Sequence, residues 1–359
     1  MPVDPRMISL TREARGWNQA ELASEINVTQ GHLSKLEAGL VETGPEMLTK
    51  LADALACPPA LLEYQSPAVG LEVTCLHHRR RASTMGAPTR KRIEALARLT
   101  RISVDGLFAG VELVRDHHLQ RAEAGHAIDP IQAASDTRLA LGLDELAPIP
   151  NVVGAVESAG VIIVHRALGT ASQDAVSTWP RGGGAPMMLV NTGLAPDRLR
   201  FTIAHELGHL VMHAAPGADQ EAEADSFASA FLAPAESVRP DLVGITTSDL
   251  MRLVRTKTKW GLSVAALVRR ARDLGEIDGA TYKDFIIRMS RLGWRRSEPG
   301  AVEPEAPTLV PRLIDLRRKE QGLSDSQLAD LALMNETVFR RYFLLESDAQ
   351  PTMKLVINE

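Results

Sequence analysis

Residues 201–213 read FTIAHELGHLVMH, and this stretch does most to decide the fold. Its apolar residues recur at helical spacing, so we expect an amphipathic helix that lines a cleft. His205 and His209 lie four residues apart, one turn above each other and roughly 40° apart around the helix axis. Both imidazoles can therefore face a single ion, and the H-E-x-x-H spacing predicts Zn2+ as that ion.

Glu206 follows the first of these histidines, so its carboxylate can reach a water at the metal rather than the metal itself. We expect it to take the proton from that water and to pass it to the leaving amine, which is peptide hydrolysis without a covalent intermediate. His213 lies about 80° round the helix from His205, too far for easy ligation, and is expected to line the cleft or to form a hydrogen bond. Three candidates for stabilising the oxyanion stay open: His165, His213 and Tyr282.

A second helix, expected over residues 220–232, reads QEAEADSFASAFL. Glu221 and Asp225 are four residues apart and therefore share a face. A catalytic zinc needs a third protein ligand and an open coordination position. We predict that Glu221 is this ligand and that Asp225 accepts the N–H of a ligating histidine. Glu223 points about 200° away from Glu221 and is expected to be a solvated charge.

The N-terminal residues 6–63 carry apolar side chains that recur mostly every three or four positions, with breaks at residues such as Gly16. This pattern predicts short amphipathic helices in a five-helix bundle. An N-cap is expected at Asn18, where Glu21 completes a capping box, and another at Thr29.

The remaining segments give an α+β chain that is mostly helical. Short apolar runs at 160–165 and 186–191, bounded by turn formers, predict two strands before the histidine helix. Residues 77–81 and 90–92 form a basic cluster, which could contact phosphates or simply be a solvated connector. The predicted order is a helix-turn-helix bundle (1–64), a helical connector (65–140), a peptidase domain with a small sheet (141–297), and a proline-rich linker with a C-terminal helical segment (298–359).

A short repeat is visible in the last segment. Leu316, Gly322, Leu328 and Phe339 stand at a constant offset of 306 from Leu10, Gly16, Leu22 and Leu33. Two explanations stay open: an internal repeat, and plain convergence of two helical sequences.

Composition limits the classes of protein that the chain can be. Charged residues at 24% and hydrophobic residues at 45% are ordinary globular values. A net charge of −5 does not suit a chain that binds nucleic acid over its whole surface, so DNA binding requires a local surface. The spacing of Cys57 and Cys75 fits neither a disulfide framework nor a zinc site. The chain has no signal-like start and no apolar run of membrane length, so we expect a cytoplasmic protein without a membrane partner.

Residues 197–209 and 221–234 resemble segments of the ImmA/IrrE metallopeptidases. The likeness covers about residues 151–300 and includes the stretches 174–177, 189–191 and 260–267. It implies a zincin-like fold and a zinc metallo-endopeptidase. Similar members cleave helix-turn-helix repressors in stress or mobile-element responses, so the resemblance implies such a repressor as the protein substrate. In the wider zinc-peptidase class a Glu-x-x-x-Asp helix supplies the third ligand, which Glu221 and Asp225 match, although this family usually has asparagine at the second position.

Residues 6–63 resemble the XRE family of phage-repressor-like helix-turn-helix domains, with 19–23 opening the second helix and 29–37 as the recognition helix. The resemblance implies that five residues face the major groove of DNA: Gln30, Gly31, His32, Ser34 and Lys35. Residues 1–64 contain five Lys/Arg against nine Asp/Glu, net −4. Non-specific DNA affinity of this domain alone is therefore expected to be poor.

Two functions stay open at this point. The first is a zinc endopeptidase whose N-terminal domain brings it to operator DNA or to a similar repressor. The second is a transcription regulator or antitoxin-like DNA-binding protein in which the metallopeptidase fold is a sensor or inactive. The set of two histidines, one general base and one carboxylate ligand favours the enzyme, because a structural zinc site would close its fourth position with a protein ligand. A homodimer is an open alternative to a monomer.

Overall fold

The computed structural model describes residues 2–65, 86–122, 128–180, 184–214, 219–344 and 355–357. The basic run at 77–81 and Cys75 lie outside these residues. The chain forms two compact units: Met1–Val114 with Ile162–Thr192 and Pro307–Glu359, and Arg115–Val161 with Gly193–Ala306. Helices dominate both units, and a three-stranded sheet lies in the first, so the predicted α+β, mostly helical class is confirmed.

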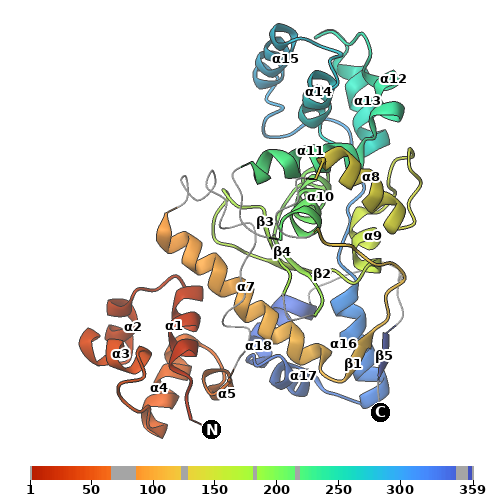
Figure 1. The fold of residues 1–359 in the computed structure, drawn as a ribbon. Coiled ribbons are helices and arrows are strands. Elements are labelled where there is room, and N and C mark those ends of the chain that lie inside the picture. Colours follow the sequence, from red (N-terminus) through yellow and green to blue (C-terminus); the bar gives the residue numbers. More distant parts are fainter. Residues whose placement is uncertain are drawn as a thin grey trace. The chain divides into compact units, whose positions relative to one another are not determined.

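The N-terminal bundle has the five helices expected from its apolar spacing (Figure 1): α1 (Pro5–Ala14), α2 (Gln19–Glu25), α3 (Gln30–Glu37), α4 (Pro45–Leu55) and α5 (Pro59–Leu62). Asn18 caps α2, and its side chain and that of Glu21 bond each other's backbone N–H in a capping box. Thr29 caps α3 by accepting from the N–H of His32. Local sequence signals therefore set the start of both helices of the helix-turn-helix.

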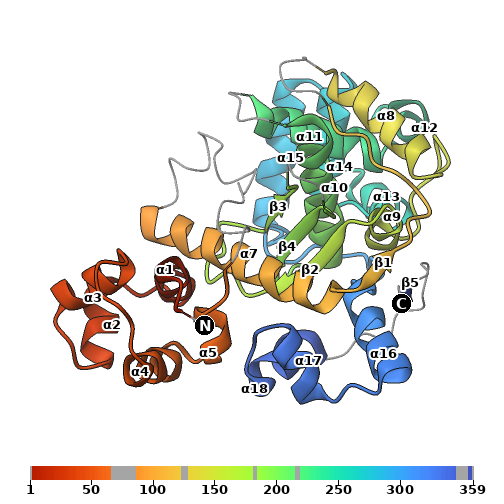
Figure 2. The same ribbon diagram turned by 60° about the horizontal axis from the view of Figure 1, so that its bottom comes forward.

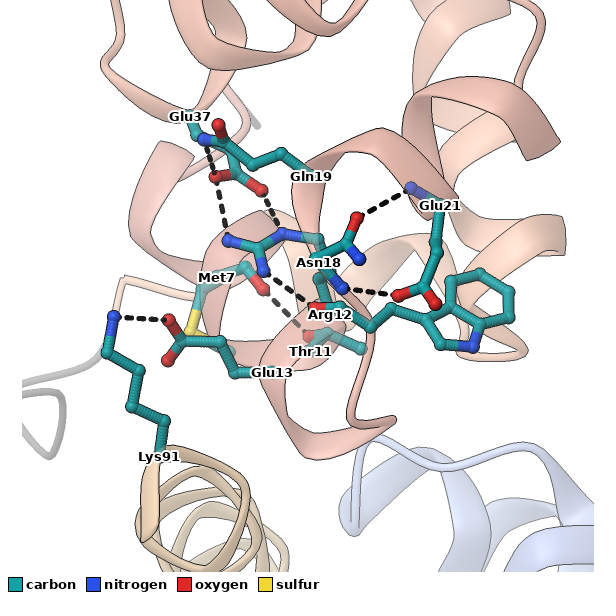
Figure 3. Close-up of polar contacts among 10 residues, drawn as sticks. Met7, Thr11, Arg12, Glu13, Asn18, Gln19, Glu21, Glu37 and Lys91 are labelled. Carbon is teal, nitrogen blue, oxygen red and sulfur yellow. Dashed lines mark hydrogen bonds and ion pairs between the residues drawn. The ribbon is translucent and has the colours of Figure 1, made fainter. Parts of the chain in front are cut away.

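A buried ion pair joins the first three helices of this bundle (Figure 3). The guanidinium of Arg12 donates to both carboxylate oxygens of Glu37, at 2.6 and 2.9 Å, and to the carbonyl of Trp17 at 2.8 Å. Gln19 Nε2 donates to the same carboxylate at 2.8 Å. The side chains of Arg12 and Glu37 are 9% and 6% exposed, so solvent screens the pair little.

The rest of the first unit is built around a long helix and the sheet. Helix α7 (Ala87–Phe108) packs against α1 and contributes apolar side chains to the core of the N-terminal bundle and to that around the sheet. The sheet has the order β2 (Ile162–Arg166), β4 (Met187–Asn191), β3 (Ala175–Thr178), with β2 parallel and β3 antiparallel to β4. Strand β3 was not predicted, because it has four residues and two of them are hydroxylated.

The C-terminal segment completes this unit with α16 (Leu309–Gln321), α17 (Asp325–Leu331), α18 (Glu336–Phe339) and the π-helix η3 (Arg340–Leu344) (Figure 2). Its apolar side chains share one core with α7 and the sheet. Arg317 fixes α16 to the end of α7 by donating to the carbonyls of Leu107 and Ala109. A two-stranded ladder pairs β1 (Val111–Leu113) with β5 (Leu355–Ile357).

The second unit is helical in its described residues: α8 (Pro130–Ala140), α9 (Val152–Ser158), α10 (Pro196–Met212), α11 (Gln220–Leu232), α12 (Ala235–Leu242), α13 (Leu250–Trp260), α14 (Val264–Asp273) and α15 (Gly279–Arg291). Helix α10 packs against α8, α9 and α11, and nearly all of its residues are buried. The segment after α15 is fixed to this unit by two carboxylates. Glu298 accepts from Lys257 and from the N–H of Val264, and Glu305 pairs with Arg200. Across the described residues, the structure contains no helix with the length and hydropathy of a membrane span.

Candidate metal centre

Buried polar contacts fix the first turns of α10, the helix that carries the H-E-x-x-H motif. Asp197 accepts from Lys257 Nζ at 2.6 Å, and Arg200 donates to the carbonyl of Ile149 at 2.7 Å as well as pairing with Glu305. Burial alone would lower the pKa of Lys257, but its hydrogen bonds to Asp197 and Glu298 outweigh this and raise the pKa. Lys257 therefore stays charged and anchors the helix at neutral pH.

Helix α11 lies against α10 and brings the carboxylates to the histidines (Figures 1 and 2). Phe227 and Phe231 stack on its buried side, with ring centroids 5.7 Å apart. A Cβ on Gly208 would lie 3.0 Å from the ring of Phe227, so a larger residue at this position would push that ring away by a few tenths of an ångström. The close crossing puts the start of α11 beside the histidine pair.

The predicted ligands come together at this crossing. The Nε2 atoms of His205 and His209 are 3.1 Å apart. Glu221 Oε1 lies 3.2 Å from His209 Nε2, and Glu221 Oε2 lies 3.9 Å from His205 Nε2. One ligand atom from each residue falls within 4.8 Å of the others, which is the spacing of a metal-binding group. Both histidines are buried, and the side chain of Glu221 is 15% exposed.

The outer ring nitrogens show which tautomer each histidine adopts. Asp225 Oδ1 is 2.9 Å from His205 Nδ1, and a carboxylate only accepts, so His205 carries its proton on Nδ1. Glu223 Oε2 is 2.9 Å from His213 Nε2. By the same logic a neutral His213 carries its proton on Nε2, which leaves a lone pair on Nδ1. His209 Nδ1 lies 2.9 Å from that lone pair and therefore donates to it. Both Nε2 atoms then carry lone pairs that face each other.

This arrangement suits a bound cation. The two Nε2 atoms are 3.1 Å apart, and their facing lone pairs repel each other unless a positive charge lies between them. A tetrahedral zinc with both nitrogens at about 2.1 Å separates them by about 3.4 Å, close to the observed value. Two imidazoles and one carboxylate are also a common ligand set for catalytic zinc, which keeps a fourth position open. The side chains present therefore fit a divalent metal.

Glu206 follows His205 on α10 and is 1% exposed. Among the described residues, its Oε2 atom has no hydrogen-bond partner. A buried carboxylate oxygen without a donor is costly, and sites that bind and transform a ligand are where such cost is tolerated. Glu206 is thus the carboxylate next to the ligands that is available to a water or a substrate.

His213 forms hydrogen bonds, which was one of the two alternatives expected for it. It caps the C-terminal end of α10, and its ring connects His209 to Glu223. The expectation for Glu223 changes. Glu223 is not only a solvated charge, since it holds the proton on His213 Nε2 although its side chain is 42% exposed. His165 belongs to β2 of the first unit, where burial lowers the pKa of its ring. Tyr282 lies on α15 and faces the guanidinium of Arg272.

The predicted DNA-contacting residues lie at the start and middle of α3. Gln30, Gly31, Ser34 and Lys35 are exposed, whereas His32 is half-buried. His32 lines a shallow hollow of about 610 Å³ together with residues of the turn between α2 and α3. The surface of α3 that is open to a partner is therefore formed by the other four.

We expect Asp225→Ala and His213→Ala to weaken metal affinity about 10- to 100-fold, because each removes the group that orients one ligating ring. Competition against a chromophoric chelator measures the affinity. Glu236→Ala, an exposed acid at the start of α12, is the matched control and should leave it unchanged. Equal affinities in all four proteins would show that these contacts do not support the site.

Two parts of the chain match the models of known protein families. Residues 156–272 match the family model of the IrrE N-terminal-like domain, Peptidase_M78, and this span contains both α10 and α11. Residues 8–62 match the helix-turn-helix family model. The comparison with curated proteins returned no match. The chain thus contains a region similar to helix-turn-helix domains and, after it, a region similar to the IrrE N-terminal-like domain of the Peptidase_M78 model.

Proposed function

We propose that this protein is a zinc-dependent endopeptidase coupled to a DNA-binding helix-turn-helix domain. One observation carries the proposal: two histidines of α10 and a carboxylate from the next helix offer ligand atoms within 4.8 Å of one another. The residue after the first histidine, Glu206, has a buried carboxylate oxygen without a donor. A structural metal site would need a fourth protein ligand, and it would have no use for a general base such as Glu206. His205, His209 and Glu221 are the proposed ligands.

When bound, the metal would acidify a water and polarise the scissile carbonyl. Glu206 accepts the proton of the attacking water on its free oxygen and delivers it to the leaving amine. Asp225 holds His205 in position, and the Glu223–His213 pair does the same for His209. Because α10 is buried and fixed at its first turns, these groups are already oriented before a substrate arrives.

The proposed substrate is a helix-turn-helix repressor, and the proposed role is the release of stress-response or mobile-element genes. The matched domains and the resemblance to repressor-cleaving peptidases support this choice. Gln30, Ser34 and Lys35 on α3 would contact operator DNA and bring the peptidase to such a repressor. The competing function is a regulator that binds DNA and senses through the metal without cleaving.

Labelling of new protein N-termini separates these two functions. Wild type or Glu206→Gln is incubated with a lysate of the source cells, and the termini that form are identified by mass spectrometry. The proposal predicts termini within helix-turn-helix proteins that appear with wild type and not with the variant. Identical terminus profiles, from two proteins that both bind a promoter fragment, would favour the regulator.

A further inference from the structure

The C-terminal helices repeat the N-terminal helix-turn-helix at an offset of 306 residues. Helix α2 (Gln19–Glu25) and helix α17 (Asp325–Leu331) have seven residues each and coincide after this shift. Helix α3 begins at Gln30 and helix α18 at Glu336, again 306 apart. The match therefore extends to both ends of the second helix and to the start of the third, which continues as the π-helix η3 after Phe339.

The turn between the paired helices has the same backbone in both places. Asn27 and Leu333, 306 residues apart, have φ values of +55° and +50°. They are two of the three non-glycine residues with positive φ in the described part of the chain. A leucine adopts this conformation only when its surroundings require it. In each turn the next N–H, of Val28 or Met334, donates at 2.9 Å to the carbonyl five residues earlier.

Caps and core positions agree as well. A capping box opens both second helices, formed by Asn18 with Glu21 and by Ser324 with Gln327. Left-handed glycines end both first helices, at positions 16 and 322. Three buried pairs follow the same shift: Leu22 and Leu328, Ala23 and Ala329, Leu33 and Phe339. Convergence of helical periodicity alone does not predict identical caps, identical turns and identical core positions.

A polar contact also joins three helices in each copy. In the first copy Glu37 on α3 binds Arg12 and Gln19. In the second copy Asp325, at the position of Gln19, binds Arg318 at 2.5 Å and Arg340 at 2.8 Å. Arg318 corresponds to Arg12 and Arg340 to Ser34. The shared acid lies on the third helix in the first copy and on the second helix in the second copy. In both copies it connects the first helix, the second helix and the third helical segment.

The exposed face of the second copy has the chemistry of a base-reading surface. Along α18 and the first two residues of η3, the side chains follow the order seen in residues 30–35 of α3: two exposed, one half-buried, one buried, two exposed. The exposed ones are Glu336, Thr337, Arg340 and Arg341, where α3 has Gln30, Gly31, Ser34 and Lys35. Arginine pairs with guanine, and threonine contacts the thymine methyl group. Arg340 is paired with Asp325 and Glu336, so Thr337 and Arg341 are the side chains available to a base.

Charge favours the second copy over the first as a partner of DNA. Residues 309–344 contain six Lys/Arg and five Asp/Glu, net +1, whereas the corresponding residues 3–38 contain four Lys/Arg and five Asp/Glu, net −1. Phosphate repels the second copy less. We propose that residues 309–344 form a second helix-turn-helix that reads double-stranded DNA through Thr337 and Arg341. The proposal rests on the DNA-binding role proposed for the first copy.

Selection from a random double-stranded DNA library tests this with the full-length chain. Wild type should enrich DNA with two separate conserved sequence blocks. Thr337→Ala/Arg341→Ala should lose one block, and Gln30→Ala/Lys35→Ala the other. Binding of the two-block DNA by the first double variant should weaken roughly 5- to 150-fold, the range for a lost bidentate base contact. Ser290→Ala/Arg291→Ala, a matched exposed pair on α15, should keep both blocks.

The outcomes separate the two proposals. If wild type enriches one block, and only Gln30→Ala/Lys35→Ala removes it, the second reading surface is overturned while DNA binding by the first copy stands. If Thr337→Ala/Arg341→Ala keeps wild-type affinity and blocks, the second copy serves a protein partner or the fold alone, and the proposal is overturned. If wild type enriches nothing, both proposals about DNA fail. Circular dichroism of each variant verifies that the helices are intact.

Discussion

Glu206→Gln should lower the rate of peptide cleavage by about 10²- to 10⁴-fold, the usual contribution of a general base. Glutamine keeps the size of the side chain but cannot take a proton from water. The buried oxygen without a donor is the atom that this substitution disables. The initial rate of cleavage of a substrate identified from its new N-termini gives the effect, with metal content measured on the same sample.

The metal should remain in that variant, because the proposed ligands are the two histidines and Glu221. Glu236→Gln is the control and should retain full activity, since this acid is exposed on α12. A wild-type rate in Glu206→Gln would remove this residue from the reaction. Loss of metal in the variant would instead make Glu206 a ligand, which the assigned roles do not allow.

Arg12→Ala should destabilise the N-terminal helix-turn-helix by about 3–5 kcal/mol, the cost of leaving one member of a buried ion pair without its partner. The substitution strands the carboxylate of Glu37, which then keeps only Gln19 as a donor. It also frees the carbonyl of Trp17. Hydrogen–deuterium exchange of the full chain measures this loss of stability helix by helix, and protection across α3 should fall by roughly 200- to 5,000-fold.

Two further variants make that result interpretable. Lys50→Ala removes an exposed pair with Glu46 and should not change the protection of α3 measurably. Arg12→Met/Glu37→Met removes both charges and should recover part of the loss, because no buried charge then lacks its counterion. Wild-type protection in Arg12→Ala would mean that the ion pair contributes nothing to the bundle.

Local signals explain what could be predicted from the sequence. The capping box at Asn18, the N-cap at Thr29 and the four-residue interval of His205 and His209 are each contained within one or two helical turns. Such features follow from backbone geometry and need no knowledge of tertiary contacts. Strand β3 gave a weaker signal, because four residues are too few to show a period.

The features that could not be predicted from the sequence depend on contacts between residues far apart in the chain. The role of Glu223 depends on how α10 and α11 cross, and periodicity along α11 alone places this residue on the far side from Glu221. At this crossing Gly208 lies against the ring of Phe227. Arg200 and Glu305 are 105 residues apart in sequence, and nothing in the proline-rich stretch around Glu305 predicts that this acid pairs with α10. The evidence that the C-terminal segment repeats the N-terminal helices lies in the shared turn and caps, which the spacing of apolar residues does not show.

X-ray absorption at the zinc edge tests most directly whether His205, His209 and Glu221 hold one cation. For wild type the account predicts two imidazoles and a first shell of nitrogen and oxygen alone, at about 2.0–2.1 Å. His213→Ala should keep both imidazoles, whereas His209→Ala should keep one or lose the zinc. Sulfur scattering near ~2.3 Å, or two imidazoles still present in zinc-loaded His209→Ala, would contradict the account.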